Sequence, residues 1–377
     1  MQAMIRPSST AHSSTPPEYT VQSYPHPLSL PADACALFTA AEAISPEISV
    51  AWFANLVDTV YPADSGIRLY VLRENGQPIA TLAVRHVRER WKTRVESLSN
   101  YYTAFYAPIL HPDITEHALS VLLRFICRDG STAASFRFAP MDPASAGFTK
   151  LMAAFSLAGL SPFRYFSFGN WFLKVDQDWV AYLKGRSGTL RNTIKRLGKR
   201  LVNDGGSLEL VRAGPRLDQA IHAYQQVYAA SWKGAEPYPE FVPGLARLAA
   251  QRGWLRLGVA RLGETPIAAQ LWMVCNGRAE IYKVAYHQDY QAYAPGTLLT
   301  AMLMEHVIDH DKVFEVDYLI GDDAYKKTWM SDRRERWGIV AYNRHNLTGL
   351  VGWVRESLGR AYRRVRPRVE AASNTAK

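Results

Sequence analysis

LRLGVARLGETPIAAQLWMV, residues 255–274, has the pattern of a β-hairpin. Two apolar runs flank Gly263, and glycine accepts the positive φ that a tight turn requires. In the first half of the chain, LYVLRENGQPIATLAVR at residues 69–85 repeats this plan, with Asn75 and Gly76 at its turn. The chain therefore contains an internal repeat.

The segments that follow the two hairpins also correspond. After the first hairpin we predict a strand, a helix, a strand, a helix and a strand, at residues 98–106, 114–128, 135–139, 146–158 and 165–175. After the second we predict the same order at residues 278–286, 295–310, 313–318, 325–330 and 337–342. Two copies of one α+β unit explain this order, and each is expected to be a mixed, mostly antiparallel sheet flanked by helices.

Amphipathic helices are predicted outside these units. Residues 179–201 combine an apolar stripe with a basic face, and two further helices are expected at residues 217–232 and 241–251. Residues 347–365 repeat the pattern, with apolar positions set against arginines. This last helix has three candidate docking partners: its own domain, a membrane surface or another protein.

Length and composition set the domain plan. A chain of 377 residues with 48% hydrophobic and 21% charged residues exceeds what one core usually supports. We expect a disordered lead-in at 1–30, a first domain at 31–177, a second domain at 178–345, and a basic helix and tail at 346–377. Three scattered cysteines and the lack of a long apolar run predict a cytoplasmic protein without a membrane span, peripheral contact with the inner membrane face remaining open.

The charge is uneven. The formal net charge is +10, with basic clusters at residues 184–200 and 355–368. An anionic partner is therefore expected, although charge alone does not distinguish a nucleotide cofactor, an acidic carrier protein, tRNA and a lipid surface. Two solvated helix faces are the simpler alternative.

One candidate anion site lies where the strand ending at Tyr286 leads into a helix. Pro295 suits the first helical turn, and Gly296 and Thr297 follow it. Free N–H groups at a helix start attract a pyrophosphate or a carboxylate. The alternative is a plain strand-to-helix connection.

A second candidate site is FEVDYLIGDDAYKKTWMSD, residues 314–332, which places an acid, a phenol and ammonium groups after a short strand. Acyl transfer can use such groups. Lys326 is suited to meet the oxyanion, Tyr325 to protonate the leaving group and Asp322 to orient the nucleophile. The alternative is a surface loop in which acids and lysines pair.

Other chemistries lack their motifs. His306 and His310 share a helix face, but no third ligand or HExxH spacing accompanies them, so no metal site is predicted. The sequence has no GxSxG elbow, P-loop or CxxC pair, which disfavours a serine hydrolase, a P-loop enzyme and a redox protein.

Taken in order, RNTIKRLGKRL, ASW, GETPIAAQLWM, IYKVAYHQDYQAYAPGTLL and FEVDYLIGDDAYKKTW resemble the BioF-like/CelD-type GNAT acyltransferases, relatives of the Fem peptidoglycan aminoacyltransferases. The resemblance covers residues 179–342 and implies two tandem GNAT-like domains, of which the first is degenerate. It implies acyl-CoA, acetyl-CoA or an acyl carrier protein as donor, and an amine or hydroxyl acceptor in exopolysaccharide or cell-envelope synthesis.

The resemblance also implies roles for residues in the matched segments. Lys326 matches a substrate-site lysine of Fem relatives, and Tyr325 the tyrosine that protonates the leaving sulfur in GNAT enzymes. The segment from Tyr286 through Pro295, Gly296 and Thr297 would bind the cofactor. The candidate substrate-binding residues are Arg191, Gln270, Tyr282, Lys283, Asp317 and Trp329.

Two departures from the family pattern matter. Gly296 stands at the helix start without the closely spaced glycine pair of the usual pyrophosphate motif, and no long helical arm like that beside tRNA in Fem enzymes is present. Nucleic acid is thus disfavoured as a partner. A non-catalytic accessory protein of polysaccharide biosynthesis and a Fem-like aminoacyltransferase remain as alternatives.

Overall fold

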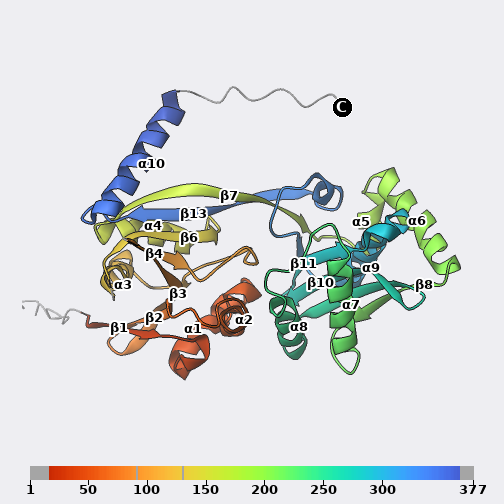
Figure 1. The fold of residues 1–377 in the computed structure, drawn as a ribbon, viewed down its shortest axis with the longest axis horizontal. Helices are drawn as coiled ribbons and strands as arrows, with labels where there is room; N and C mark the ends of the chain where they lie inside the picture. The colour runs from red at the N-terminus through yellow and green to blue at the C-terminus, as the bar shows by residue number, and fades with distance from the viewer. Residues whose placement is uncertain (1–16, 91, 130, 366–377) are drawn as a thin grey trace, which may run out of the picture.

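The structure is a computed structural model and describes residues 17–90, 92–129 and 131–365. Within these ranges, thirteen strands form one continuous sheet whose pairs are mostly antiparallel, with helices packed against it (Figure 1). The predicted α+β class is confirmed. The strands are β1 (Tyr19–Tyr24), β2 (Ile67–Glu74), β3 (Gln77–Glu89), β4 (Lys92–Ser97), β5 (Ile109–Leu110), β6 (Ala133–Met141), β7 (Ser161–Lys174), β8 (Gly206–Val211), β9 (Leu255–Leu262), β10 (Thr265–Cys275), β11 (Arg278–Tyr286), β12 (Glu315–Asp317) and β13 (Asp332–Tyr342).

The helices connect and cover these strands. The α-helices are α1 (Ala32–Glu42), α2 (Val50–Val60), α3 (Glu116–Arg128), α4 (Ala146–Leu157), α5 (Trp179–Lys184), α6 (Gly188–Asn203), α7 (Leu217–Ala229), α8 (Phe241–Gln251), α9 (Pro295–Asp309) and α10 (Leu347–Val365). The 3-10 helices are η1 (Pro27–Ser29), η2 (Pro46–Ile48), η3 (Gln288–Tyr293) and η4 (Ala324–Thr328). None of the helices in the described ranges combines the length and the hydrophobicity that a membrane span requires.

Both predicted hairpins are present. In the β2–β3 hairpin, Asn75 and Gly76 have φ values of 50° and 84°, the paired positive values that a two-residue hairpin turn needs. In the β9–β10 hairpin, Gly263 has φ 55°. The two halves repeat one order of elements, and each contains one parallel pair, β4 with β6 and β11 with β12.

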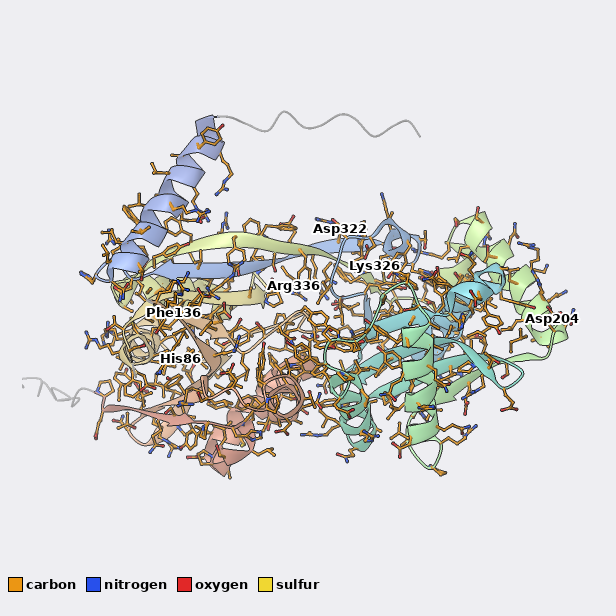
Figure 2. All side chains as sticks on the ribbon, in the orientation of Figure 1. His86, Phe136, Asp204, Asp322, Lys326 and Arg336 are labelled. Carbon is orange, nitrogen blue, oxygen red and sulfur yellow. The ribbon has the colours of Figure 1, made fainter. Side chains whose placement is uncertain are left out.

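The last strands of the two halves are exchanged. The sheet order is β1-β2-β3-β4-β6-β13-β7-β12-β11-β10-β9-β8, so β13 lies beside β6 of the first half and the end of β7 lies beside β12 of the second. The side chains follow the backbone. Ile339 of β13 packs in the larger core cluster, which contains Phe136 of the first half (Figure 2) and extends to α7 and α8. Leu173 of β7 packs in the second cluster, against β10 and α9 of the second half.

The prediction of a strand at residues 98–106 is wrong. The strand is β4, which ends at Ser97, and residues 98–106 form an irregular segment that buries the rings of Tyr102, Phe105 and Tyr106. Its backbone finds a side-chain partner in place of a neighbouring strand, because Oε2 of Glu47 accepts hydrogen bonds from the N–H groups of Ala104 (2.6 Å) and Phe105 (2.8 Å).

The lead-in and the basic helix also differ from expectation. Residues 1–16 lie outside the described residues, but residues 19–24, expected to be disordered, form β1 because their backbone pairs with β2 along its whole length. The helix expected at 179–201 is divided into α5 and α6. Gly185 caps the first, and the Ser187 side chain accepts from Leu190 N to begin the second.

Candidate active site

The candidate site lies where β11 and β12 separate. These parallel strands pair at three positions, from Arg278 with Glu315 to Glu280 with Asp317. Beyond these pairs β12 ends, while β11 continues to Tyr286. Two adjoining cavities occupy the opening, and both are lined by Val284 of β11 and by Tyr318, which follows β12.

The first cavity, which we call the helix-end cavity, has a volume of about 340 Å³ and lies at the start of α9. Pro295 is the first residue of α9, and Gly296 and Thr297 line the cavity. The first N–H groups of a helix have no partner within it, so they are available to an anion here. The Gln270 amide donates to Gly296 O and to Thr300 Oγ1, both at 2.8 Å, which fixes the wall. The remaining lining residues include Tyr286 and Trp329.

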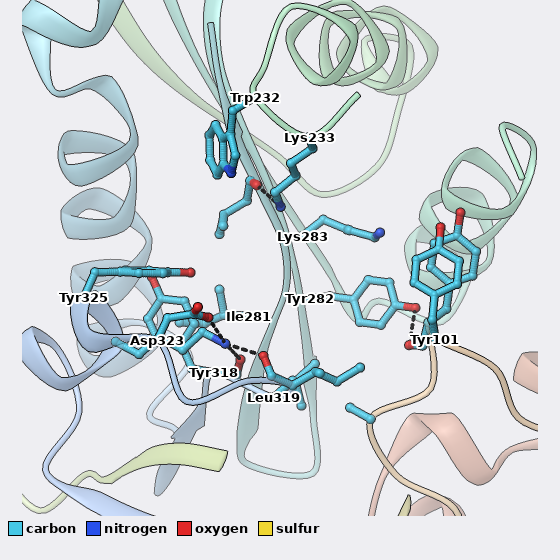
Figure 3. A pocket seen from close by; sticks show the side chains of 15 residues that line it. Tyr101, Trp232, Lys233, Ile281, Tyr282, Lys283, Tyr318, Leu319, Asp323 and Tyr325 are labelled. Carbon is cyan, nitrogen blue, oxygen red and sulfur yellow. Dashed lines mark hydrogen bonds and ion pairs between the residues drawn. The ribbon is translucent and has the colours of Figure 1, made fainter. Parts of the chain in front are cut away.

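The second cavity, which we call the lysine cavity, has a volume of about 310 Å³. Its lining includes Lys233, Lys283 and Lys326, together with Tyr101 from the first half of the chain (Figure 3). Three ammonium groups in one cavity make it suited to an anionic group or to developing negative charge.

Lys326 is held by its own loop. It is 4% exposed, and its Nζ donates to the carbonyl oxygens of Ile320, Tyr318 (3.4 Å) and Gly321 (3.4 Å). It also pairs with Oδ2 of Asp323 at 3.4 Å. Burial lowers its pKa, which the nearby carboxylates partly offset. The ammonium therefore fixes the loop after β12 while its side chain lines the cavity.

Lys283 and Lys233 stand on the opposite wall. Nζ of Lys283 lies 3.3 Å from Oε1 of Glu236 and 4.4 Å from the ring centre of Tyr102. Burial lowers its pKa, against the opposing effect of Glu236. Nζ of Lys233 donates to Val284 O at 2.7 Å, and desolvation and then the Lys283 ammonium lower its pKa to about 8. Lys233 can thus lose a proton near neutral pH.

Tyr325 lies at the boundary, because it lines both cavities. Its ring packs edge-on against Tyr318, with centroids 5.6 Å apart. Burial and then Asp323 raise its pKa to about 12, so the hydroxyl keeps its proton at neutral pH. A protonated phenol at this boundary can donate a hydrogen bond or a proton to a group that spans both cavities.

The structure places three of the other predicted residues outside both cavity linings and brings the fourth, Tyr282, into the lysine cavity. Asp322 is outside both cavity linings: it accepts from Trp171 Nε1 at 2.6 Å and pairs with Arg333 at 2.8 Å, and this pairing lowers its pKa. Asp317 is buried in the sheet, where it accepts from Leu319 N at 2.7 Å. Arg191 is exposed on α6. Tyr282 lines the lysine cavity and donates to Tyr102 O at 2.9 Å.

Several residues in or beside this site carry no clear signal in the sequence. Lys233, Trp232 and Glu236 come from the loop after α7, and Tyr101 from the irregular segment of the first half. The only sequence signal was the tryptophan that ends the ASW motif, because the contribution of these residues depends on distant segments meeting. Among the described residues, no group of three or more His, Cys, Asp and Glu side chains is arranged to hold a metal ion.

The comparisons with known proteins agree with this geometry. Residues 188–327 match the family model for the acetyltransferase (GNAT) domain. No curated protein sequence matches the chain at a significant level.

Several solved structures share the fold. The C-terminal DUF2156 domain of a protein described as a lysylphosphatidylglycerol synthetase from Agrobacterium fabrum is 17% identical, with a TM-score of 0.53, covering 88% of this chain and 96% of its own. A tandem GNAT protein from the clavulanic acid biosynthesis pathway is 15% identical, with a TM-score of 0.52 and coverages of 85% and 98%. FemX is 11% identical, with a TM-score of 0.53 and coverages of 76% and 90%. At these identities the likeness concerns the fold.

Proposed function

We propose that this chain transfers an acyl group from acyl-CoA to an amine or hydroxyl acceptor, because residues 188–327 match the family model for the acetyltransferase (GNAT) domain and the fold is similar to that of a tandem GNAT protein. The observation that carries the proposal is the pair of adjoining cavities at the separation of β11 and β12. One cavity meets a helix start and the other is lined by lysines, so a phosphate-bearing donor and an acceptor each have a matching surface.

The helix-end cavity is the proposed donor site. The free N–H groups at the start of α9 suit the pyrophosphate of CoA, and the wall formed by Tyr286 and Trp329 suits its less polar arm. An acyl carrier protein would present a similar arm, so the two donors share this chemistry.

The transfer is proposed to occur at the boundary of the cavities. The acceptor nitrogen or oxygen attacks the thioester carbonyl, a C–N or C–O bond forms, the C–S bond breaks, and the acceptor proton passes to a base. Lys233, with its pKa of about 8, is the proposed base. Tyr325 is proposed to give its proton to the departing sulfur. Lys326 supplies positive charge beside the developing oxyanion while it holds the loop.

The acceptor class is the least constrained part of the proposal. The basic lining favours an acceptor that carries an anionic group near its reacting amine or hydroxyl. A place in exopolysaccharide or cell-envelope synthesis, and the alternative of an aminoacyl donor, rest on the family resemblance.

A charge substitution tests the donor site. Thr297→Glu places a carboxylate in the first turn of α9, where it favours the helix dipole but repels a pyrophosphate. We expect acetyl-CoA to raise the Tm of the wild-type chain and to bind this variant at least about tenfold more weakly. Thr348→Glu makes the same change in the first turn of α10 and should bind like wild type.

Two results decide between the functions. Equal acetyl-CoA binding by the wild-type chain and the Thr297→Glu variant would refute this donor site. Binding of CoA thioesters without turnover, across amine- and hydroxyl-bearing acceptors, would instead favour the non-catalytic accessory protein. Mass spectrometry of ligands retained by the purified chain would distinguish acyl-CoA from an acyl carrier.

A further inference from the structure

The helix α10 packs on the first half of the chain through its small and polar side. A Cβ at Gly349 would lie 2.5 Å from Ala134 O, so only glycine permits this approach. Nη2 of Arg360 donates to Arg164 O at 2.7 Å, and its guanidinium lies 4.9 Å from the ring centre of Phe163. The helix therefore docks on its own domain, without using its apolar stripe.

The apolar stripe of α10 faces solvent. Its members are spaced four, three and four residues apart, which places them along one line of a helix, about opposite Gly349 and Arg360. The exposed fractions are 78% for Leu347, 61% for Val351, 40% for Val354 and 65% for Leu358. In Figure 1, α10 projects from the end of β13 away from the rest of the molecule. A contiguous exposed apolar stripe of this kind marks an interaction surface.

The charge of this part of the chain points to a partner. In the sequence, residues 344–368 contain seven arginines and one glutamate, and the structure describes this segment up to residue 365. Of these arginines, Arg355 is exposed beside the stripe, whereas the single glutamate, Glu356, pairs with Arg360 at 2.8 Å and lies 3.9 Å from Arg363. A second copy of the chain would bring the same positive charges against these, which opposes self-association through this face. A surface that has both an apolar layer and negative charge can contact the stripe and pair with the arginines at the same time.

We infer that α10 is a membrane-surface anchor: its apolar stripe enters the headgroup boundary of an anionic bilayer, and its arginines contact the lipid phosphates. Such a helix lies in the plane of the interface. The inference stands independently of the proposed acyl transfer.

Vesicle cosedimentation of the full chain tests this anchor. We expect binding to phosphatidylcholine vesicles in which about one lipid in three is the anionic phosphatidylglycerol. Binding to vesicles of pure phosphatidylcholine should be much weaker. The double variant Val351→Asp and Leu358→Asp should bind at least about tenfold more weakly. Reversing Arg355 and Arg363 to glutamate should also weaken binding at least about tenfold, with the stripe intact.

The control is Val180→Asp, which changes a valine on α5 that is 72% exposed. This variant should bind like wild type. Circular dichroism establishes whether each variant is folded. If the stripe variant is unfolded, the arginine variant decides whether α10 binds the membrane. Equal binding of all variants, or no binding of the wild-type chain, would overturn the inference. So would a dimer that the stripe substitutions dissociate, observed by analytical ultracentrifugation without vesicles.

Discussion

The Ser45 hydroxyl donates a hydrogen bond of 3.2 Å to Oε1 of Glu280, joining η2 of the first half to β11 of the second. Glu280 is 7% exposed, and Glu47 beside it is 1% exposed. Burial and the nearby Asp317 carboxylate raise the pKa of Glu280 to about 8, and burial and Glu280 raise that of Glu47. The halves thus meet around acids that resist ionisation.

This contact predicts a pH-dependent stability. Above a pH of about 4.5 the unfolded carboxyl ionises and the folded one does not, so stability is lost as pH rises toward 8. Glu280→Gln removes this cost, and we expect it to stabilise the chain by about 1–3 kcal/mol at pH 8 and by little at pH 4.5. Urea unfolding at the two pH values measures the difference. Glu264→Gln, in the exposed turn of β9–β10, should change neither value, and a gain at pH 4.5 equal to that at pH 8 would contradict this account.

The exchanged strand predicts where stability resides. Ile339 of β13 is fully buried in the core cluster that contains Phe136, so Ile339→Ala should destabilise the chain by about 2–4 kcal/mol through the cavity it leaves. Val340 is its half-buried neighbour on the other face, and Val340→Ala should cost less than about 1 kcal/mol. Denaturant unfolding compares the two, and equal losses would refute the role of β13 in this core.

The local elements were predictable because short-range patterns determine them. The turn at Asn75 and Gly76 and the start of α9 at Pro295 follow from backbone preferences of those residues alone. The strand exchange was not predictable from these patterns. The aromatic strands at 161–174 and 332–342 both suit the neighbours of β6 and β12, and the sequence pattern contains nothing that assigns each to one edge.

The candidate site was predictable only in part, for the same reason. Tyr325 and Gly296 lie in motifs that the sequence presents as continuous segments. Lys233 is a single lysine in a turn, and its pKa is lowered by desolvation and then by Lys283, both of which depend on how the fold surrounds it. From the sequence, Asp322 was as good a catalytic candidate as Tyr325, but in the fold its carboxylate pairs with Arg333.

A base at Lys233 predicts the pH profile of transfer. Its amine must be unprotonated to accept the acceptor proton, so kcat/KM should rise with pH through an apparent pKa of about 8. Lys233→Met should lower kcat/KM by about 100-fold and remove this inflection. The measurement is steady-state transfer between pH 6 and 9.5, an ordinary range for such profiles. An unchanged inflection in the variant would assign it to another group, and Lys184→Met, on α5, is the matched control.

Tyr325→Phe separates the chemistry from the packing. The Tyr325 hydroxyl makes no hydrogen bond to the residues that the structure describes, and phenylalanine keeps the ring contact with Tyr318, so the Tm should stay within about 2 °C. We expect kcat to fall about 10- to 100-fold with acetyl-CoA binding unchanged. Tyr293→Phe, which removes a hydroxyl bonded to Asp204 away from both cavities, should transfer at the wild-type rate. A wild-type kcat for the Tyr325 variant would exclude it as the proton donor.

The pairing of β13 with β6 has a consequence for synthesis on the ribosome. While the nascent chain grows from Met141 to Asp332, the edge of β6 that β13 finally covers lacks its native partner. An uncovered strand edge of this kind can pair with the wrong strand. The growing polypeptide is therefore most exposed to mispairing with other chains while the residues between β6 and β13 are being synthesised.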